Sequence, residues 1–372
     1  MIRYLRLQNF KCFEEEVFRF RPLTLLSGLN GTGKSSVLQS LLLLRQSYQQ
    51  GLLQQKIGLT LNGDLIQIGT ARDALFEGAV GDFFGYNLVL DGEKTVSWFF
   101  RYNSEADVLE LTHYDADDET YESSLFRNRF HYLQAERIGP RMFYGMSDYQ
   151  VRQLRQLGSS GEHTAHFLSI FGKDEISNMN LSHPRAKSLN LHDQVEAWLG
   201  EVSPGTRIHL ILNPNIDIVS LQYSFEMGNQ ISNYYRATNV GFGITYALPV
   251  IVALLSSVPD SLILIENPEA HLHPRGQAKM GELLALAANA GIQIVVETHS
   301  DHVLNSIRVA VHDGKISPDD VQLHFFQRRE QDGRIEVISP QIDRDGRLDQ
   351  WPDGFFDEWD KSLEALLQPR KE

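Results

Sequence analysis

The segment that most constrains this chain is Gly28-Leu29-Asn30-Gly31-Thr32-Gly33-Lys34-Ser35, which fits the pattern G-x-x-x-x-G-K-[ST]. An apolar run at 23–27 precedes it, and a long apolar helix is expected to run from Val37 to about Gln50. Between a strand and a helix, such a loop wraps a polyphosphate with its backbone N–H groups and with the positive end of the helix. The sequence therefore predicts a phosphate-binding loop on an α/β fold.

The side chains of this loop have distinct expected roles. Lys34 should reach the β- and γ-phosphates of a nucleotide, and Ser35 should ligate Mg²⁺. ATP and Mg²⁺ are accordingly the expected ligands. The positions of the loop expected to contact them are Gly28, Asn30, Gly31, Thr32, Gly33, Lys34, Ser35 and Ser36.

A second candidate half of the site lies more than 200 residues later. The apolar, β-branched run at 261–265 ends in Glu266, as expected for a central parallel strand that delivers an acid to Mg²⁺. Pro274 is placed to open a helix that runs to about Asn289 and stops at Gly291. Another apolar strand, at 292–296, then precedes His299.

The residue after Glu266, the candidate Walker B acid, departs from the usual pattern. Most P-loop relatives carry a second acid there, whereas this chain has Asn267, whose amide can orient water but cannot take its proton. Glu269 is the nearest replacement base, so slow hydrolysis is an open alternative. His271 and His273 could form a metal site with Glu269, although a place at the seam between two copies of the chain explains their position better.

The stretch between the two halves holds an antiparallel sheet and a basic segment. Short alternating runs over 59–112 predict strands, and the acidic stretch at 105–122 is expected to be a solvated loop. Basic and aromatic residues then interleave, and they would either pair with the acidic loop or form a local DNA, RNA or partner surface. The residues of this segment are Arg127, Arg129, Phe130, Tyr132, Arg137, Arg141, Phe143, Tyr144, Tyr149, Arg152 and Arg155.

Charge and composition exclude several classes of protein. The formal net charge of -14 argues against a surface that grips nucleic acid everywhere. A membrane span would need about 20 uninterrupted apolar residues, which the sequence lacks, so we expect a cytoplasmic protein without a membrane partner. The single cysteine, Cys12, excludes an internal disulfide and is expected to be a buried thiol without a chemical role.

The run 268–274, P-E-x-H-L-H-P, followed by E-T-H-S at 297–300, resembles the ABC-type ATPases of the overcoming-lysogenization-defect and DNA-repair class, an armless, SMC-like group. The resemblance implies that His299 is a switch histidine and that the loop 239–245, with Gly241 and Gly243, reaches across a dimer to the γ-phosphate. It also implies a Q-loop role for Gln134, toward Mg²⁺ and the attacking water.

The C-terminal stretch 349–359 resembles the tail of a bacterial subfamily with a C-terminal domain of unknown function. The class includes ATPase subunits of antiphage systems such as Septu, in which the ATPase is paired with a nuclease. The resemblance therefore implies an ATP-driven homodimer, or a higher even oligomer, that controls an effector protein or a nucleic acid. The alternatives are a nonhydrolytic or very slow ATP-dependent scaffold and a DNA-repair ATPase.

The expected fold class is α/β: an ABC-type P-loop head with a mixed central sheet, an appended antiparallel sheet, a helical insertion and a small C-terminal α+β extension. Four segments follow from the motifs: 1–126 with the phosphate-binding loop (Walker A) and the antiparallel sheet, 127–205 with the Q-loop and a helical insertion, 206–317, and 318–372 as the extension. The segment 206–317 holds the signature loop at 239–245, the Walker B acid Glu266 and the H-loop with His299. A GTPase lacks support because no N-K-x-D element is present, and the tail lacks the ordered acidic cluster of a nuclease.

Overall fold

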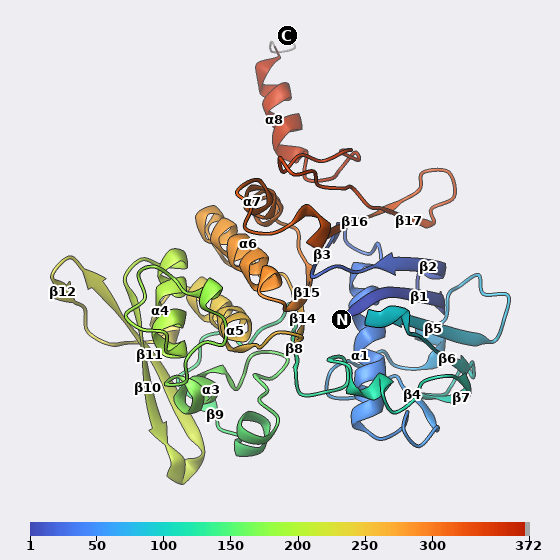
Figure 1. The fold of residues 1–372 in the computed structure, drawn as a ribbon, viewed down its shortest axis with the longest axis horizontal. Coiled ribbons are helices and arrows are strands. Elements are labelled where there is room, and N and C mark those ends of the chain that lie inside the picture. Colours follow the sequence, from blue (N-terminus) through green and yellow to red (C-terminus); the bar gives the residue numbers. More distant parts are fainter. Residues whose placement is uncertain (369–372) are drawn as a thin grey trace.

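The computed structural model describes residues 1–368 and is built around a six-stranded central sheet (Figure 1). The strand order is β17-β16-β3-β15-β14-β8, and every neighbouring pair is parallel except β16 and β17. The expected mixed sheet is therefore confirmed. Its strands are β3 (Leu23–Gly28), β8 (Phe130–Leu133), β14 (Leu262–Glu266), β15 (Gln293–Glu297), β16 (Val321–Arg328) and β17 (Ile335–Ile338).

The central sheet separates two hydrophobic cores. Successive side chains of a strand point to opposite faces, so Ile263 and Ile265 join one core while Leu262 and Leu264 join the other. Since both faces are covered, the central strands are apolar throughout. The helices of the first core, which lie on one side of the sheet in Figure 1, are α4 (Leu191–Val202), α5 (Phe242–Ser256), α6 (Pro274–Asn289) and α7 (Asp301–His312).

The second core lies between the central sheet, helix α1 (Lys34–Gln49) and an antiparallel sheet. That sheet has the strand order β2-β1-β5-β6-β7-β4, which confirms the expected appended sheet. The short helix α2 (Ala71–Ala74) lies between β4 and β5 in the chain. The strands are β1 (Ile2–Phe10), β2 (Phe13–Arg19), β4 (Gly58–Thr60), β5 (Phe83–Leu90), β6 (Thr95–Arg101) and β7 (Val108–Tyr114).

The acidic stretch at 105–122 is not the continuous loop that its composition predicts, because β7 occupies its middle. Leu109 is buried in the second core, and the neighbouring Glu110 faces outward and pairs with Arg101 of β6 at 2.9 Å. The strand thus buries one side chain while solvent and a cross-strand partner accommodate its acids. The expectation of a loop was wrong for this part of the stretch.

A third sheet lies beyond the helices of the first core. Its main feature is a long antiparallel ribbon, and three short strands extend it. Helix α3 (Thr164–Phe171) and α4 contribute to the core beneath it, as the expected helical insertion. The strands are β9 (Tyr144–Gly145), β10 (Thr206–Asn213), β11 (Ile218–Met227), β12 (Gln230–Ile231) and β13 (Tyr235–Arg236).

The C-terminal segment begins inside the central sheet. Strand β16 pairs with β3, the strand that leads into the phosphate-binding loop, so the sheet crosses the boundary expected at residue 318. The last helix, α8 (Glu358–Leu367), projects away from the rest of the molecule (Figure 1). Among residues 1–368, no helix is long and apolar enough to cross a membrane.

Candidate functional site

The phosphate-binding loop joins β3 to α1 in a backbone shape that two of its glycines make possible. Gly28 has φ 137° and Gly33 has φ 99°, values that side-chain-bearing residues rarely adopt. A Cβ on Gly28 would lie 2.2 Å from the carbonyl oxygen of Phe326, and one on Gly33 would lie 2.4 Å from the sulfur of Cys12. The loop is therefore packed tightly from beneath, and Cys12 serves as part of that packing.

Lys34 is buried at the first residue of α1. Its ammonium donates hydrogen bonds to the carbonyl oxygens of Gly28 at 3.0 Å and Leu29 at 2.7 Å. Burial lowers the pKa of Lys34, and the nearby Glu297 carboxylate counteracts part of that shift. The loop thus holds its cation against its own carbonyl groups, at the N-terminus of a helix where a phosphate is favoured.

Ser35, the expected Mg²⁺ ligand, donates its hydroxyl to Glu297 Oε2 at 2.9 Å. The other oxygen of Glu297 lies 3.9 Å from the Lys34 ammonium. Burial raises the pKa of Glu297, and the neighbouring Glu266 adds to that effect while the Ser35 bond opposes it. Sequence analysis did not select Glu297, although the strand-end position of this acid just ahead of His299 was a usable signal.

Glu266 ends β14, the strand on the far side of β15 from the loop strand β3. Its carboxylate accepts a hydrogen bond from the Tyr132 hydroxyl at 2.9 Å and another from the Ala135 backbone N–H at 3.1 Å. Both donors belong to β8 or to the loop that follows it. The Walker B candidate is thus fastened toward the sheet edge that β8 forms.

Arg137 is a residue of this site that sequence analysis placed only in the basic segment. It is 2% exposed, and burial lowers the pKa of its guanidinium to about 10. The guanidinium donates to the backbone carbonyls of Gln134, Glu266 and Asn267. Because these carbonyls belong to the ends of two neighbouring strands, Arg137 ties the Q-loop segment to the Walker B segment.

The chain turns sharply after Glu266. Asn267 has φ 45°, a left-handed conformation that asparagine tolerates better than most residues. The turn brings Glu269 back toward the next strand, where its Oε1 accepts a hydrogen bond from the His299 backbone N–H at 2.8 Å. The side-chain oxygen Oδ1 of Asn267 and Oε2 of Glu269 are both buried without a hydrogen-bond partner within residues 1–368.

His299 and the loop share a cavity of about 940 Å³ with the C-terminal segment. Gly28, Leu29 and His299 line one part of it, and Phe356 and Trp359 line another. The structure therefore brings His299 beside the phosphate-binding loop. Other loop positions face different ways: Thr32 donates to the Leu29 carbonyl at 2.7 Å, Ser36 is buried in α1, and Asn30 and Gly31 are exposed.

The expected signature loop lies elsewhere. Gly241 is the N-cap of α5, and Gly243 lies in its first turn. Together with Asn239, His271 and His273 they line a separate cavity of about 520 Å³, which shares no lining residue with the cavity beside the phosphate-binding loop. Among residues 1–368, the signature loop and the phosphate-binding loop thus line two different cavities.

Gln134 follows β8 directly, next to the turn that Arg137 holds. Its side-chain amide donates to the Glu136 carbonyl at 3.1 Å, and its backbone N–H donates to Ser159. Its side chain is therefore bound within its own loop and not to the phosphate-binding loop. A role toward Mg²⁺ or water stays a prediction for this residue.

The basic segment has several kinds of local contact, and the expected pairing with the acidic stretch is confirmed at Arg127. Arg127 pairs with Glu122 of the acidic stretch, but Arg152 pairs with Asp148 on its own helical turn, and Arg155 stacks over Phe171. Arg137 is buried in the site. The arginines at 127, 152 and 155 thus have separate local partners, and a DNA, RNA or partner surface in this segment stays a prediction.

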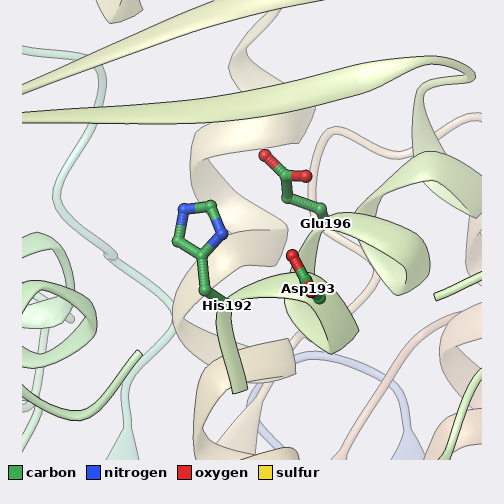
Figure 2. A group of neighbouring side chains, drawn as sticks. All are labelled: His192, Asp193 and Glu196. Atoms are coloured by element: carbon green, nitrogen blue, oxygen red, sulfur yellow. The ribbon is translucent and has the colours of Figure 1, made fainter. Parts of the chain in front are cut away.

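The metal site considered at Glu269, His271 and His273 is not formed in residues 1–368, and a different group of metal-ligating side chains lies together on α4. Among residues 1–368, Glu269, His271 and His273 do not bring three ligand atoms together, and His273 instead caps α6 through the Arg275 N–H. His192, Asp193 and Glu196 do lie together on α4 (Figure 2).

The α4 cluster has a structural explanation. Both oxygens of Glu196 are engaged, one by Arg207 at 2.8 Å and one by the Ile208 backbone N–H at 2.7 Å. Asp193 accepts from the Ser188 hydroxyl at 2.6 Å. The carboxylates therefore already have hydrogen-bond partners, and the cluster fastens α4 to β10.

The donors beside the phosphate-binding loop fit ATP and Mg²⁺. A hydroxyl and a carboxylate, as supplied by Ser35 and Glu297, are the hard oxygen ligands that Mg²⁺ prefers. A lysine and a helix N-terminus, in turn, fit a polyphosphate.

Comparison with known proteins agrees with this geometry. Residues 23–305 match the family model described as "AAA domain, putative AbiEii toxin, Type IV TA system", and residues 316–366 match the model described as a protein of unknown function, DUF3696. No curated protein matches.

Two solved structures share the fold. One is the Smc head bound to the C-winged helix domain of ScpA, with 13% identity and a TM-score of 0.55 over 92% of this chain and 98% of that chain. The other is the Smc head domain with an extended coiled coil bound to the C-terminal domain of ScpA from Pyrococcus furiosus, with 12% identity and a TM-score of 0.54 over 99% of both chains. The expected SMC-like head fold is confirmed.

Proposed function

The chain belongs to the AAA-domain family whose model matches residues 23–305, and from this premise we propose that it is an ATPase in which two copies enclose ATP and thereby control a partner. Each ATP would lie between the phosphate-binding loop of one copy and the signature loop of the other. The observation that carries this proposal is the separation of the two loops into cavities that share no residue. A second copy of the chain can bring its signature loop to a triphosphate bound at the phosphate-binding loop of the first copy.

Within one copy, the proposed roles follow from position. Backbone N–H groups of the loop and Lys34 bind the phosphates, and Ser35 with a neighbouring carboxylate holds Mg²⁺, which when bound neutralises phosphate charge. His299 lies beside the loop in the same cavity and would contact the γ-phosphate side. From the partner copy, Gly241 at the α5 N-terminus would add a second anion-binding helix end.

Hydrolysis in this arrangement would be slow. Asn267 takes the position of the usual catalytic acid, and its left-handed backbone suits asparagine. Glu269 is the proposed base, but one of its oxygens is bound to the His299 N–H. A site that holds ATP longer than it cleaves it suits a switch, because the lifetime of the dimer then sets the signal.

The proposed output is control of an effector protein, such as a nuclease in bacterial antiphage defence, as the resemblance implies. The Smc heads with the same fold are each bound to a domain of a partner protein, ScpA. A nonhydrolytic scaffold is the second candidate, and Asn267 is the observation that favours it. Steady-state phosphate release separates the two: a slow ATPase turns over many times, whereas a scaffold releases no phosphate.

The test of the dimer is the mass of the purified protein with and without ATP and Mg²⁺. The proposal predicts a shift from one copy to two on adding ATP, with two nucleotides bound per dimer. Lys34→Ala should abolish the shift. A wild-type protein that binds ATP with no change in mass would contradict the composite site.

A further inference from the structure

Glu297 and Glu266 are two strand-end carboxylates near the phosphate-binding loop. Glu297 is hydrogen-bonded to that loop, whereas Glu266 is hydrogen-bonded to β8 and the residues after it. Strand β15 lies between the loop strand β3 and the Walker B strand β14, and Glu297 and Glu266 occupy paired positions on β15 and β14. The carboxylate of Glu297 is therefore one strand closer to the loop. Its hydrogen bond to Ser35 is the direct consequence.

Glu266 is directed the other way by its partners. Tyr132 donates to one oxygen at 2.9 Å and the Ala135 N–H donates to the other at 3.1 Å. Arg137 binds the carbonyl of the same residue at 2.7 Å. All three donors come from β8 or the loop after it, so the contacts of Glu266 fasten β14 to its neighbour.

Glu297 instead contacts side chains of the phosphate-binding loop. One oxygen accepts the Ser35 hydroxyl, and the other lies 3.9 Å from the Lys34 ammonium, beyond hydrogen-bond range. Glu297 is 7% exposed, so few water molecules can reach its carboxylate. It faces the two side chains of the loop that a magnesium-bound triphosphate requires.

We infer that Glu297, and not Glu266, is the acid that works with Ser35 in holding Mg²⁺, and that without the metal it hinders the nucleotide. This inference rests on the proposed ATP site. Glu297 accepts the Ser35 hydroxyl and places a negative charge beside the phosphate-binding loop, where it repels a triphosphate that carries no metal. With Mg²⁺ present, the same charge becomes favourable.

Two opposite effects of one side chain follow. Removing the charge of Glu297 should strengthen nucleotide binding in the absence of a divalent metal, because repulsion between two anions is lost. It should weaken binding in the presence of Mg²⁺, because an oxygen ligand or its support is lost. A residue with only a structural role would change both affinities in the same direction.

The experiment measures binding of a nonhydrolysable ATP analogue, AMPPNP, by calorimetry in Mg²⁺ and in EDTA. For Glu297→Gln, we expect about threefold tighter binding in EDTA and about tenfold weaker binding in Mg²⁺ than for the wild type. Glu266→Gln is the matched control, since it removes the same charge one strand away. It should change both affinities in the same direction and by less than about threefold.

Three results would overturn the inference: weakening in both conditions by Glu297→Gln, no change in either, or a reversal of sign in Glu266→Gln instead. If Glu297→Gln fails to fold, Glu297→Asp retains the charge with a shorter reach. It should lose about threefold of the Mg²⁺ enhancement, and a full enhancement would contradict the inference. A wild-type protein that binds no AMPPNP at all would refute the proposed function itself, which is a distinct outcome.

Discussion

The phosphate-binding loop and the signature loop are both glycine-containing helix N-termini, but they differ in how the chain supports them. The first is packed from beneath by Cys12 and Phe326, and its lysine and serine already have hydrogen-bond partners. The second is packed only at Gly243, where a Cβ would lie 2.6 Å from the His271 carbonyl oxygen. At Gly241 an added Cβ would meet nothing within 4 Å, and Phe242 beside it is 56% exposed.

This difference indicates that one chain prepares half of a site and leaves the other half on its surface. Changes in the supported half, which is the phosphate-binding loop and the strand ends beside it, should affect folding and nucleotide binding by the single chain. Changes in the exposed half should affect the association of two chains. Variants in each half test whether the two effects are separable.

The largest expected effect is on folding, from Arg137→Met. The variant keeps an apolar side chain of similar length but leaves three backbone carbonyls without their buried charged donor. We expect a loss of about 3–5 kcal/mol in the free energy of unfolding, measured by denaturant titration. The exposed Arg127→Met, which breaks only the pair with Glu122, should cost less than about 1 kcal/mol. Equal losses would show that the strand ends do not depend on Arg137.

A second effect on the supported half comes from pH. His324, in β16 next to the loop strand, is buried, and burial lowers its pKa to about 4. The folded state therefore favours the neutral ring, so this contribution to stability is complete above the unfolded pKa of 6.5 and is lost as the pH falls toward 4. Denaturation at several pH values should show a loss of about 3 kcal/mol from pH 7 to pH 4 due to this residue. His324→Gln should flatten the slope by that amount, and an unchanged slope would contradict the assignment.

Lys34→Ala should remove nucleotide binding from the single chain. The ammonium is the only cation within hydrogen-bond reach of Gly28 and Leu29 carbonyls in the described residues, and it is the proposed phosphate ligand. We expect at least a 100-fold weaker affinity for ATP by calorimetry, with folding retained. A smaller loss, of about threefold, would place the triphosphate away from the loop.

Gly241→Asp should weaken dimerisation and leave nucleotide binding by the single chain almost unchanged. The position is open, so the substitution fits the chain, but it places a negative charge at the helix end proposed to face the partner's phosphates. ATP binding by the single chain should change by less than about twofold, whereas ATP-linked dimerisation should weaken by about tenfold in sedimentation. Gly241→Ala is the control and should alter neither. Loss of binding in the single chain would place both loops at one site.

Much of this molecule could be predicted from its sequence, for physical reasons. Buried parallel strands are apolar throughout, and Pro274 sets the start of α6, which spans Pro274–Asn289 as expected. The ribbon of β10 and β11 was not foreseen, since its alternation is interrupted at both ends by exposed residues such as Ile211 and Met227. The pairing of Glu297 with Ser35 was missed because strand order, and not spacing along the chain, brings the two together. The same holds for Arg137, whose guanidinium binds the carbonyls of Glu266 and Asn267, which are distant from it in the chain.

The most direct test of the composite site mixes two inactive variants. Lys34→Ala lacks a working phosphate-binding loop, and Gly241→Asp lacks a working signature loop, so neither should release phosphate from ATP above background. A mixed dimer contains one site built from the two intact halves, so each mixed dimer should recover up to about half of the phosphate-release rate of a wild-type dimer. Recovery of that activity is the result we predict. No recovery when mass measurement shows that mixed dimers have formed, or full activity of Gly241→Asp alone as a monomer, would contradict the account.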